Sequence, residues 1–336
     1  MDQAEALISG LVKDRKLSAA CVLVRDRGGP VYEKAFGAAK SLDARFLIAS
    51  ITKPMTAAGV MKLVDRGKLR LEDPASRYLP EFGKDGDRGK VTIRHLLTHT
   101  SGLPDMLPDN TELRRKNAPL GEFVARALKT PLLFSPGTKT SYASMAILLA
   151  SEIVHRIDGR AFPAYLRDEI YKPLGMHHTV LGLGDGLTLA DTVRSQTEFA
   201  DPDLGASADA KSWDWNSPYW RGLAAPWGGA HSTVHDIERF LRAFLTPDGK
   251  VLRASTCAEM IRDQNKGLNQ PYGIGWAIAK GFGKQCSPGT FGHGGSTGTL
   301  CWADPASGRT FVILTSLPDR VARKLVISPV SDIASA

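Results

Sequence analysis

Residues 46–57 of the sequence read FLIASITKPMTA and join an expected strand to an expected helix. The apolar run at 45–49 predicts a short strand, and helical periodicity then extends from about Ser50 to Asp65. Pro54 is compatible with this helix start because the first-turn N–H groups of a helix have no intrahelical partners. Ser50 therefore lies at a helix N-terminus, where the helix dipole favours negative charge on its oxygen.

Ser50 is the only serine in the chain with a lysine three positions later, Lys53. Residues i and i+3 share one face of a helix, so the amine can reach the hydroxyl. A desolvated lysine has a lowered pKa and can act as a base. On its own the Ser-x-x-Lys pattern is weak, since about one match is expected by chance in a chain of this length. A capping serine beside a solvated lysine is the alternative.

The two ends of the chain are rich in expected strands, and the middle is helical. We expect an amphipathic helix at 3–16, further helices at 143–157 and 233–245, and strands at 19–26, 30–36, 272–280, 290–295, 299–305 and 309–316. The most economical architecture is α+β, with one antiparallel sheet built from both termini, flanking helices and an inserted helical region. We expect residues 1–68 and 266–336 to form the sheet region and 69–265 the mainly helical region, with the functional site between them.

Composition excludes several classes of protein. The chain has 336 residues and a net charge of +8, but its basic residues are scattered, which argues against a nucleic-acid partner. No apolar run is long enough for a membrane span. The N-terminal residues lack the features of a signal peptide, which predicts a cytoplasmic protein; an export signal outside this sequence stays open. None of the cysteines, Cys21, Cys257, Cys286 and Cys301, forms a C-x-x-C pair.

The stretch at 294–298, GGSTG, fits the G-x-S-x-G pattern of the nucleophile elbow in α/β-hydrolases. In those enzymes the catalytic histidine follows the serine in the sequence, but no histidine follows Ser296. The next segment, 299–305, predicts a strand where an elbow requires a helix. Ser296 is therefore not expected to be the nucleophile.

Two histidine pairs, His95 with His99 and His231 with His235, have the i, i+4 spacing of zinc ligands. The glutamate that follows the first histidine in zinc proteases is missing, because Leu96 and Ser232 stand there. No third ligand is obvious, so we expect capping or packing histidines, no metal and no cofactor.

Other stretches place the Ser50–Lys53 pair in a wider pattern. Tyr142 and Ser144 lie at a loop-to-helix junction, and 293–298, HGGSTG, offers a strand whose glycines let a ligand approach the backbone. Acyl transfer needs a nucleophile, proton-transfer groups and an anion-binding wall. A loop at 213–227 concentrates aromatic residues and either lines a substrate pocket or forms a satellite core; its candidate residues are Trp213, Trp215, Tyr219, Trp220, Arg221 and Trp227.

These motifs, in this order, resemble the serine β-lactamase and penicillin-recognising family. The likeness is greatest to the branch of class C β-lactamases, D-stereospecific peptidases and family VIII carboxylesterases. It covers about residues 5–316 and is carried by IASITKPMTAAGVMKLVDRGKLRLEDPASRYLPEF, VTIRHLLTHTSGLP, FSPGTKTSYAS, YKPLGMHHT, GGAHSTVHDIERFL and GHGGSTGT.

The resemblance implies roles for individual residues. Ser50 matches the acylated serine, Lys53 its general base and Tyr142 the residue that protonates the leaving group. The N–H groups of Ser50 and Ser296 match the oxyanion hole. Ser144 stands where many members have asparagine and would help to order Lys53. His293, followed by Gly294 and Gly295, stands where β-lactamases have a lysine.

These departures set the expected substrate. A histidine is mostly neutral at pH 7, so recognition of a substrate carboxylate at His293 should be weaker or left to an arginine such as Arg221. We therefore expect a serine hydrolase that acts through an acyl-enzyme on small carboxylic esters. The alternatives are a β-lactamase or D-amino-acid peptidase acting on amides, and a non-catalytic binding protein with the same fold. The sequence does not set the oligomeric state.

Overall fold

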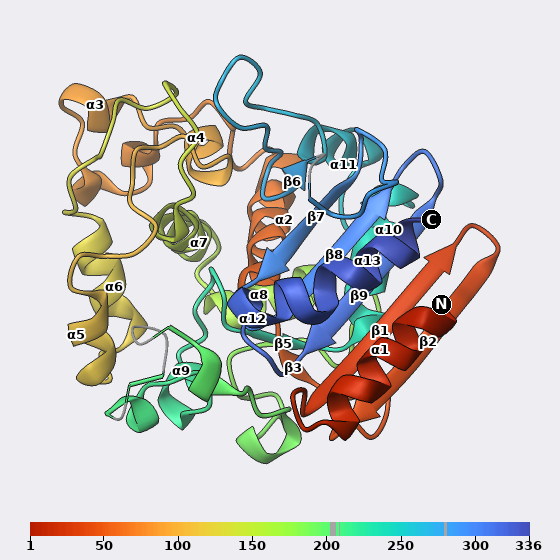
Figure 1. Ribbon diagram of the computed structural model, residues 1–336. Helices are drawn as coiled ribbons and strands as arrows, with labels where there is room; N and C mark the ends of the chain where they lie inside the picture. Colours follow the sequence, from red (N-terminus) through yellow and green to blue (C-terminus); the bar gives the residue numbers. More distant parts are fainter. Residues whose placement is uncertain (202–205, 208, 279–280) are drawn as a thin grey trace.

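The computed structural model describes residues 1–201, 206–207, 209–278 and 281–336. Within these residues, strands from both ends of the chain form an antiparallel sheet in the order β2-β1-β9-β8-β7-β6 (Figure 1). Its strands are β1 (Ala19–Asp26), β2 (Gly29–Gly37), β6 (Ala277–Ile278), β7 (Phe291–Gly295), β8 (Thr299–Asp304) and β9 (Arg309–Thr315). A small sheet has the order β3-β5-β4, with β3 (Phe46–Leu47), β4 (Val180–Leu181) and β5 (Ala230–Ser232). The expected α+β fold is confirmed.

Helices cover the larger sheet, and most of the regular structure between β3 and β6 in the sequence is helical. They are α1 (Asp2–Lys13), α2 (Thr52–Asp65), α3 (Gly86–Gly89), α4 (Ile93–Leu97), α5 (Asn110–Arg115), α6 (Leu120–Ala127), α7 (Ser144–Asp158), α8 (Phe162–Leu166), α9 (Pro218–Gly222), α10 (Val234–Leu245), α11 (Ala254–Met260), α12 (Asp319–Ala322) and α13 (Ser328–Ser335). The expected helices at 3–16, 143–157 and 233–245 correspond to α1, α7 and α10. Among the described helices, none is both long and apolar enough to cross a membrane.

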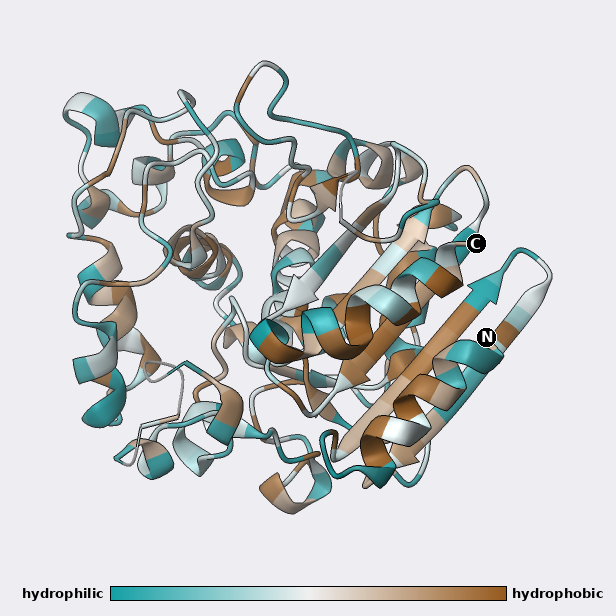
Figure 2. Cartoon of the chain, viewed as in Figure 1, coloured by the Kyte–Doolittle hydropathy of each residue, from teal (hydrophilic) through white to brown (hydrophobic). Residues whose placement is uncertain are grey.

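Alternate residues of the central strands point to opposite faces of the sheet and pack into two hydrophobic clusters, one on each face. In β1, Val22 and Val24 pack with Ile8 of α1 and Val330 of α13 on one face of the sheet. Leu23 points to the other face and joins the larger cluster that includes residues of α2 and α10. Figure 2 shows the hydrophobic residues concentrated along these strands and on the helix faces turned toward them. The result is a sheet that is buried on both faces by helices.

Two expected strands differ from the structure. The run at 45–49 contributes only β3, which pairs with β5 in the small sheet. Of the expected strand at 272–280, β6 forms only at Ala277–Ile278, and residues 279–280 lie outside the described residues. Gly275 takes a φ of +77°, and a side chain there would meet Ala57 of α2 at 2.5 Å. The chain therefore turns closely over α2 where sequence periodicity indicated extended backbone.

The division into residues 1–68 with 266–336, and 69–265, stays a prediction. Helix α10 comes from the second of these regions and contacts β1, β8 and β9. The inserted region thus contributes directly to one face of the sheet, so the two regions share a core.

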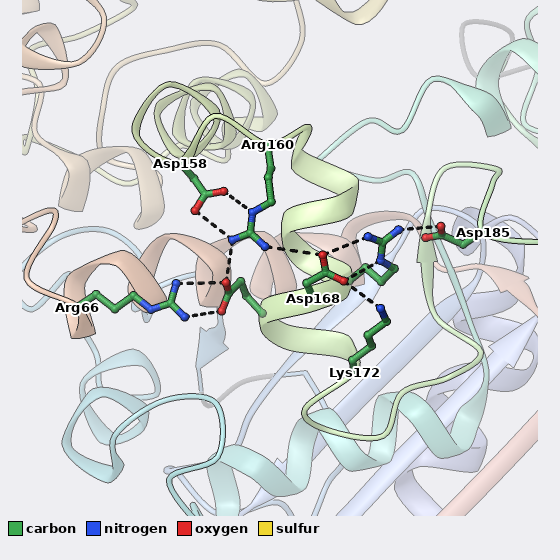
Figure 3. A network of polar contacts seen from close by, with 8 residues as sticks. Arg66, Asp158, Arg160, Asp168, Lys172 and Asp185 are labelled. Atoms are coloured by element: carbon green, nitrogen blue, oxygen red, sulfur yellow. Dashed lines mark hydrogen bonds and ion pairs between the residues drawn. The ribbon is translucent and has the colours of Figure 1, made fainter.

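A network of ion pairs joins the end of α2 to the π-helical segment η4 (Arg167–Tyr171) (Figure 3). Glu169 accepts from Arg66 at 2.6 Å and from Arg160 at 2.7 Å. The other members are Asp158, Arg167, Asp168, Lys172 and Asp185. Because most of these side chains are partly exposed, each pair contributes little, and the network serves to hold the C-terminal end of α2 in register with η4.

Three threonine hydroxyls hold the backbone that leads into α2. Thr297 donates to the carbonyl of Leu47 at 2.6 Å, and Thr299 donates to the carbonyl of Ile48 at 3.0 Å. Thr52 donates to the carbonyl of Ala49 at 2.7 Å. Ala49 begins the 3₁₀ turn η1 (Ala49–Ile51) and has a φ of +44°, which is strained for a residue with a side chain. The hydroxyls of Thr297 and Thr299 hold this strained turn against the end of β7 and the start of β8, while that of Thr52 ties it to the start of α2.

Gly295, the last residue of β7, allows this close contact. A Cβ atom there would lie 2.3 Å from the hydroxyl of Thr299 and 2.4 Å from the carbonyl oxygen of Ile48. Since the second of these atoms belongs to the backbone, β7 and η1 would have to separate to make room.

We expect Gly295→Ala to lower thermal stability because overpacking of this kind typically costs about 1–3 kcal/mol. Thermal unfolding followed by circular dichroism measures the effect. Gly289→Ala is the matched control, since a Cβ atom there meets nothing nearer than 4.0 Å. Equal melting temperatures for both variants and the original protein would contradict the contact described for β7 and η1.

Candidate active site

Ser50 lies in the middle of η1, immediately before α2, and is half-buried. Its hydroxyl accepts a hydrogen bond from the amine of Lys53 at 2.9 Å. The same amine donates to the carbonyl of Trp227 at 2.8 Å. The local geometry expected from the Ser-x-x-Lys spacing is therefore present, one turn apart at the start of α2.

Lys53 is buried, with 1% of its surface exposed. Burial disfavours the charged ammonium and lowers the pKa of Lys53 to about 7, while the carboxylate of Asp105 acts in the opposite direction. A large part of the Lys53 population is thus neutral near physiological pH. A neutral amine in hydrogen-bond contact with a serine hydroxyl can accept its proton.

Tyr142 completes the cluster around Lys53. The Lys53 amine lies 4.6 Å from the centre of the Tyr142 ring. Although 37% of the tyrosine is exposed, desolvation by the surrounding protein raises the pKa of Tyr142, and a hydrogen bond with Ser50 partly offsets this. A tyrosine with a raised pKa keeps its proton at neutral pH and is suited to donate it.

Asp105 was not expected from the sequence, yet it contacts the same region. Its carboxylate accepts from the hydroxyl of Ser144 at 2.6 Å and from the backbone N–H of Ser144 at 3.0 Å. It thereby caps the N-terminus of α7 and fixes the backbone directly after Tyr142. Ser144 thus bonds to Asp105, the carboxylate whose charge acts to raise the pKa of Lys53, and an ordering effect of Ser144 on Lys53 stays a prediction.

His293 is locked by two hydrogen bonds. Its Nδ1 lies 2.7 Å from the carbonyl oxygen of Gly294, which can only accept, so Nδ1 carries the proton. Nε2 then accepts from the hydroxyl of Tyr272 at 2.9 Å. Burial, together with the nearby charge of Lys53, lowers the pKa of His293 to about 3. His293 is therefore neutral and has no ring nitrogen left for a substrate.

His99 links the two tyrosines of the site. Its ring centre lies 4.5 Å from that of Tyr142 and 4.6 Å from that of Tyr272. Its Nδ1 accepts from the backbone N–H of Ala143 at 3.1 Å. Burial lowers the pKa of His99 well below the usual value, so this ring is a neutral spacer that fixes the position of Tyr142.

The other histidines of the two i, i+4 pairs make contacts that stabilise the fold. Thr92 and His95 cap the start of α4 through reciprocal hydrogen bonds. His231 lies in β5 and makes a contact of 2.9 Å between Nδ1 and the carbonyl of Gly182, while His235 lies 3.4 Å from Glu33. Within the described part of the chain, no three His, Cys, Asp or Glu side chains are grouped as a metal site would require.

A small cavity with a volume of about 50 Å³ lies beside Ser50. It is lined by Leu47, Ala49, Ser50, Met106, Arg114, Trp215, Trp220, Trp227, Gly228, Ser296 and Thr297. Ser50 and Ser296, whose N–H groups were expected to form an oxyanion hole, thus face one space. Gly294 and Gly295 lead the chain from His293 to that space along β7.

Only some residues of the aromatic loop at 213–227 line this cavity. Trp215, Trp220 and Trp227 line it, but Trp213, Tyr219 and Arg221 are not among the described residues that do so. The hydroxyl of Tyr219 donates to the carbonyl of Ala118 at 2.9 Å. The loop is therefore in part a pocket wall and in part a core.

The expectation that Arg221 binds a substrate carboxylate needs correction. Arg221 is fully buried and donates to the carbonyl of Trp215 at 2.6 Å and to that of Val193 at 3.0 Å. Burial lowers the pKa of Arg221 to about 10. These contacts hold the guanidinium inside the loop, away from a substrate.

Comparisons with known proteins identify the family of the chain. The family model described as Beta-lactamase matches residues 4–327. The chain belongs to the beta-lactamase family. It is a serine hydrolase of this family, which acts on small-molecule substrates. That Ser50 and Lys53 form its Ser-x-x-Lys motif stays a prediction.

Two curated relatives in the beta-lactamase family illustrate its range. Esterase EstB from Burkholderia gladioli is 28% identical over 355 residues, which cover 93% of this chain and 89% of EstB. A protein of Escherichia coli K12, provisionally named a D-alanyl-D-alanine carboxypeptidase, is 27% identical over 354 residues, covering 90% of this chain and 77% of that protein. Among solved structures, a family VIII carboxylesterase has a TM-score of 0.75 at 20% identity, covering 97% of this chain and 95% of the other, and shows the shared fold.

The pH dependence of acylation should report Lys53. Because Lys53 accepts a proton only when it is neutral, we expect kcat/KM to rise with pH through about 7 and then level off. His293 and His99 stay neutral and add no second limb in this range. Rates measured with a neutral ester from about pH 5.5 to 9 test this; a rate that is flat across the range would contradict a lysine base.

Replacement of Asp105 separates its charge from its hydrogen bonds. Asp105→Asn keeps an oxygen acceptor for Ser144 but removes the negative charge that favours protonated Lys53. We expect the acidic limb to move to lower pH by a few tenths of a unit, since an exposed charge is screened by solvent. Asp105→Ala should also lower kcat at every pH, because α7 loses its cap.

Asp109→Asn is the control for this effect. Asp109 lies in the same loop but pairs with Arg126 at 3.0 Å. If the Asp105 and Asp109 variants gave the same pH profile as the original protein, the electrostatic contribution of Asp105 would be refuted.

Proposed function

We propose that the protein hydrolyses small carboxylic esters through an acyl-enzyme. Ser50 attacks the ester carbonyl carbon while Lys53 accepts the hydroxyl proton. Tyr142 gives a proton to the leaving alkoxide as the bond between the carbonyl carbon and the leaving oxygen breaks, and takes the proton of Lys53 in return. The N–H groups of Ser50 and Ser296 stabilise the negative oxygen of the tetrahedral intermediate. Lys53, neutral again, then takes a proton from a water molecule that attacks the acyl carbon, and it passes this proton to the Ser50 oxygen as the acid leaves.

The state of His293 is the observation that favours esters over substrates with a carboxylate. Both ring nitrogens of His293 are engaged within the protein, and the ring is neutral. This position therefore supplies no cation to a β-lactam or to a peptide with a free C-terminus. Arg221 is held inside its loop, and Arg323, near Gly294, is paired with Asp319 at 3.0 Å.

Amide hydrolysis is the second candidate, as a β-lactamase or D-amino-acid peptidase. Arg114 supports it, because this residue lines the cavity beside Ser50 and brings a guanidinium there. The provisional carboxypeptidase relative from Escherichia coli points in the same direction. The ester proposal ranks first because the guanidinium of Arg114 is already engaged within the protein. Only 1% of Arg114 is exposed, and it donates to the carbonyl of Trp213 at 3.0 Å.

Three substrates distinguish these functions. We expect turnover of p-nitrophenyl butyrate to exceed that of nitrocefin and of a D-alanyl-D-alanine peptide by at least tenfold in kcat/KM, about the discrimination that one unpaired polar group provides. Turnover of nitrocefin without turnover of the ester would reverse the ranking.

Two serine variants serve as controls for this assay. Ser50→Ala should abolish acylation, whereas Ser296→Ala should retain much of it, because Ser296 acts through its backbone N–H. The opposite result would make Ser296 the nucleophile.

A non-catalytic binding protein is the remaining alternative. Intact-mass spectrometry after treatment with a fluorophosphonate or a penicillin tests it, since a reactive Ser50 forms a stable adduct. An unmodified chain with every probe would favour a binding role. The cytoplasmic location stays a prediction.

A further inference from the structure

We propose that the cavity beside Ser50 binds the acyl half of the ester and that Trp220 sets the upper limit on acyl length. This inference rests on the proposed ester hydrolysis and names the acyl groups that the same site accepts: short, uncharged chains from acetyl to about butyryl.

The position of the cavity identifies which half of the substrate enters it. Ser50 and Ser296 line it, but among the described residues that do so neither Lys53 nor Tyr142 appears. Tyr142 protonates the leaving group, so the leaving group departs on the side of Tyr142. The acyl chain, on the other side of the carbonyl carbon, is then directed into the cavity.

The walls and the size of the cavity specify the acyl group. Leu47, Met106 and three indole rings make the lining largely apolar, which suits an alkyl chain. A volume of about 50 Å³ accommodates roughly three to five non-hydrogen atoms, since a water molecule needs about 10–15 Å³. A longer acyl chain must displace part of the wall.

Trp220 is held in that wall by contacts with its neighbours. The guanidinium of Arg114 lies 4.1 Å from the centre of the Trp220 ring, a strong cation–π geometry in a buried setting. The ring of Trp227 meets it edge-on with centres 6.4 Å apart. The backbone N–H of Trp220 donates to the hydroxyl of Ser217 at 3.1 Å, which caps α9. The Trp220 ring therefore cannot swing away from a longer chain without losing its contacts with Arg114 and Trp227.

Trp213 offers a matched control within the same cluster. It lies over the same guanidinium, with the Arg114 carbon 4.8 Å from its ring centre, and it is buried to 1% exposure. Unlike Trp220, it is absent from the described cavity lining. Truncation of Trp213 removes a buried indole from the same cluster, while the bond from Arg114 to the backbone carbonyl of residue 213 and the contact of Arg114 with the Trp220 ring remain.

The test compares p-nitrophenyl acetate, butyrate, hexanoate and octanoate. We expect kcat/KM of the original protein to fall beyond butyrate. Trp220→Ala should raise the ratio of kcat/KM for hexanoate to that for acetate by on the order of tenfold or more, the effect of one or two methylene groups in a tight pocket. Trp213→Ala should leave this ratio unchanged.

Folding is checked by thermal unfolding, because loss of a buried indole is strongly destabilising. Met106→Ala provides a second route to the same result, since Met106 is only half-buried and forms another part of the wall. It too should raise the hexanoate ratio. Octanoate turnover equal to acetate turnover in the original protein would overturn the proposal, and so would equal increases of the ratio in the Trp213 and Trp220 variants.

A labelling experiment separates this proposal from the proposed function. Fluorophosphonates with ethyl or octyl chains on phosphorus modify Ser50 without requiring turnover, and intact-mass spectrometry gives the rates. Faster labelling by the ethyl reagent, with the difference reduced in Trp220→Ala, supports the pocket even if no ester is hydrolysed. Equal labelling by both reagents in the original protein would refute the pocket even if esters are hydrolysed.

Discussion

The burial of one amine governs the site. Lys53 has 1% of its surface exposed and places its amine between the hydroxyl of Ser50 and the carbonyl of Trp227. An ammonium ion in such surroundings is costly, so Lys53 is readily neutral. The contact with Trp227 also ties α2 to the aromatic loop, and Thr56 strengthens the tie by donating to the carbonyl of Pro226 at 2.6 Å. The contacts that create the base therefore also place one wall of the cavity.

The backbone before Ser50 depends on residues far away in the sequence. The strained turn at Ala49 is held by Thr297 and Thr299, which lie about 250 positions later in β8 and the turn before it. Strain of this kind persists only where neighbouring structure enforces it. The sheet from both termini therefore helps to shape the site, since the end of β7 at Gly295 lies against the turn that carries Ser50.

Sequence patterns predicted the features that depend on contacts between residues close together in the chain. Periodicity indicated α7, α10 and β9, and the Ser-x-x-Lys spacing implied the contact between Ser50 and Lys53 because both residues lie on one helical turn. Tyr142 and the role of Ser296 came from resemblance to a family, and the resemblance covers nearly the whole chain.

The residues that were missed act through distant contacts. Asp105 and Tyr272 meet Ser144 and His293 across 39 and 21 positions, and no spacing rule indicates such pairs. Their roles explain the two departures from the family pattern. Ser144 bonds to the carboxylate of Asp105, while Tyr272 occupies the nitrogen that His293 would offer a substrate. Asp105 also brings a negative charge close to Lys53 and Tyr142, which disfavours a substrate carboxylate beside them. The same two departures therefore favour a neutral ester.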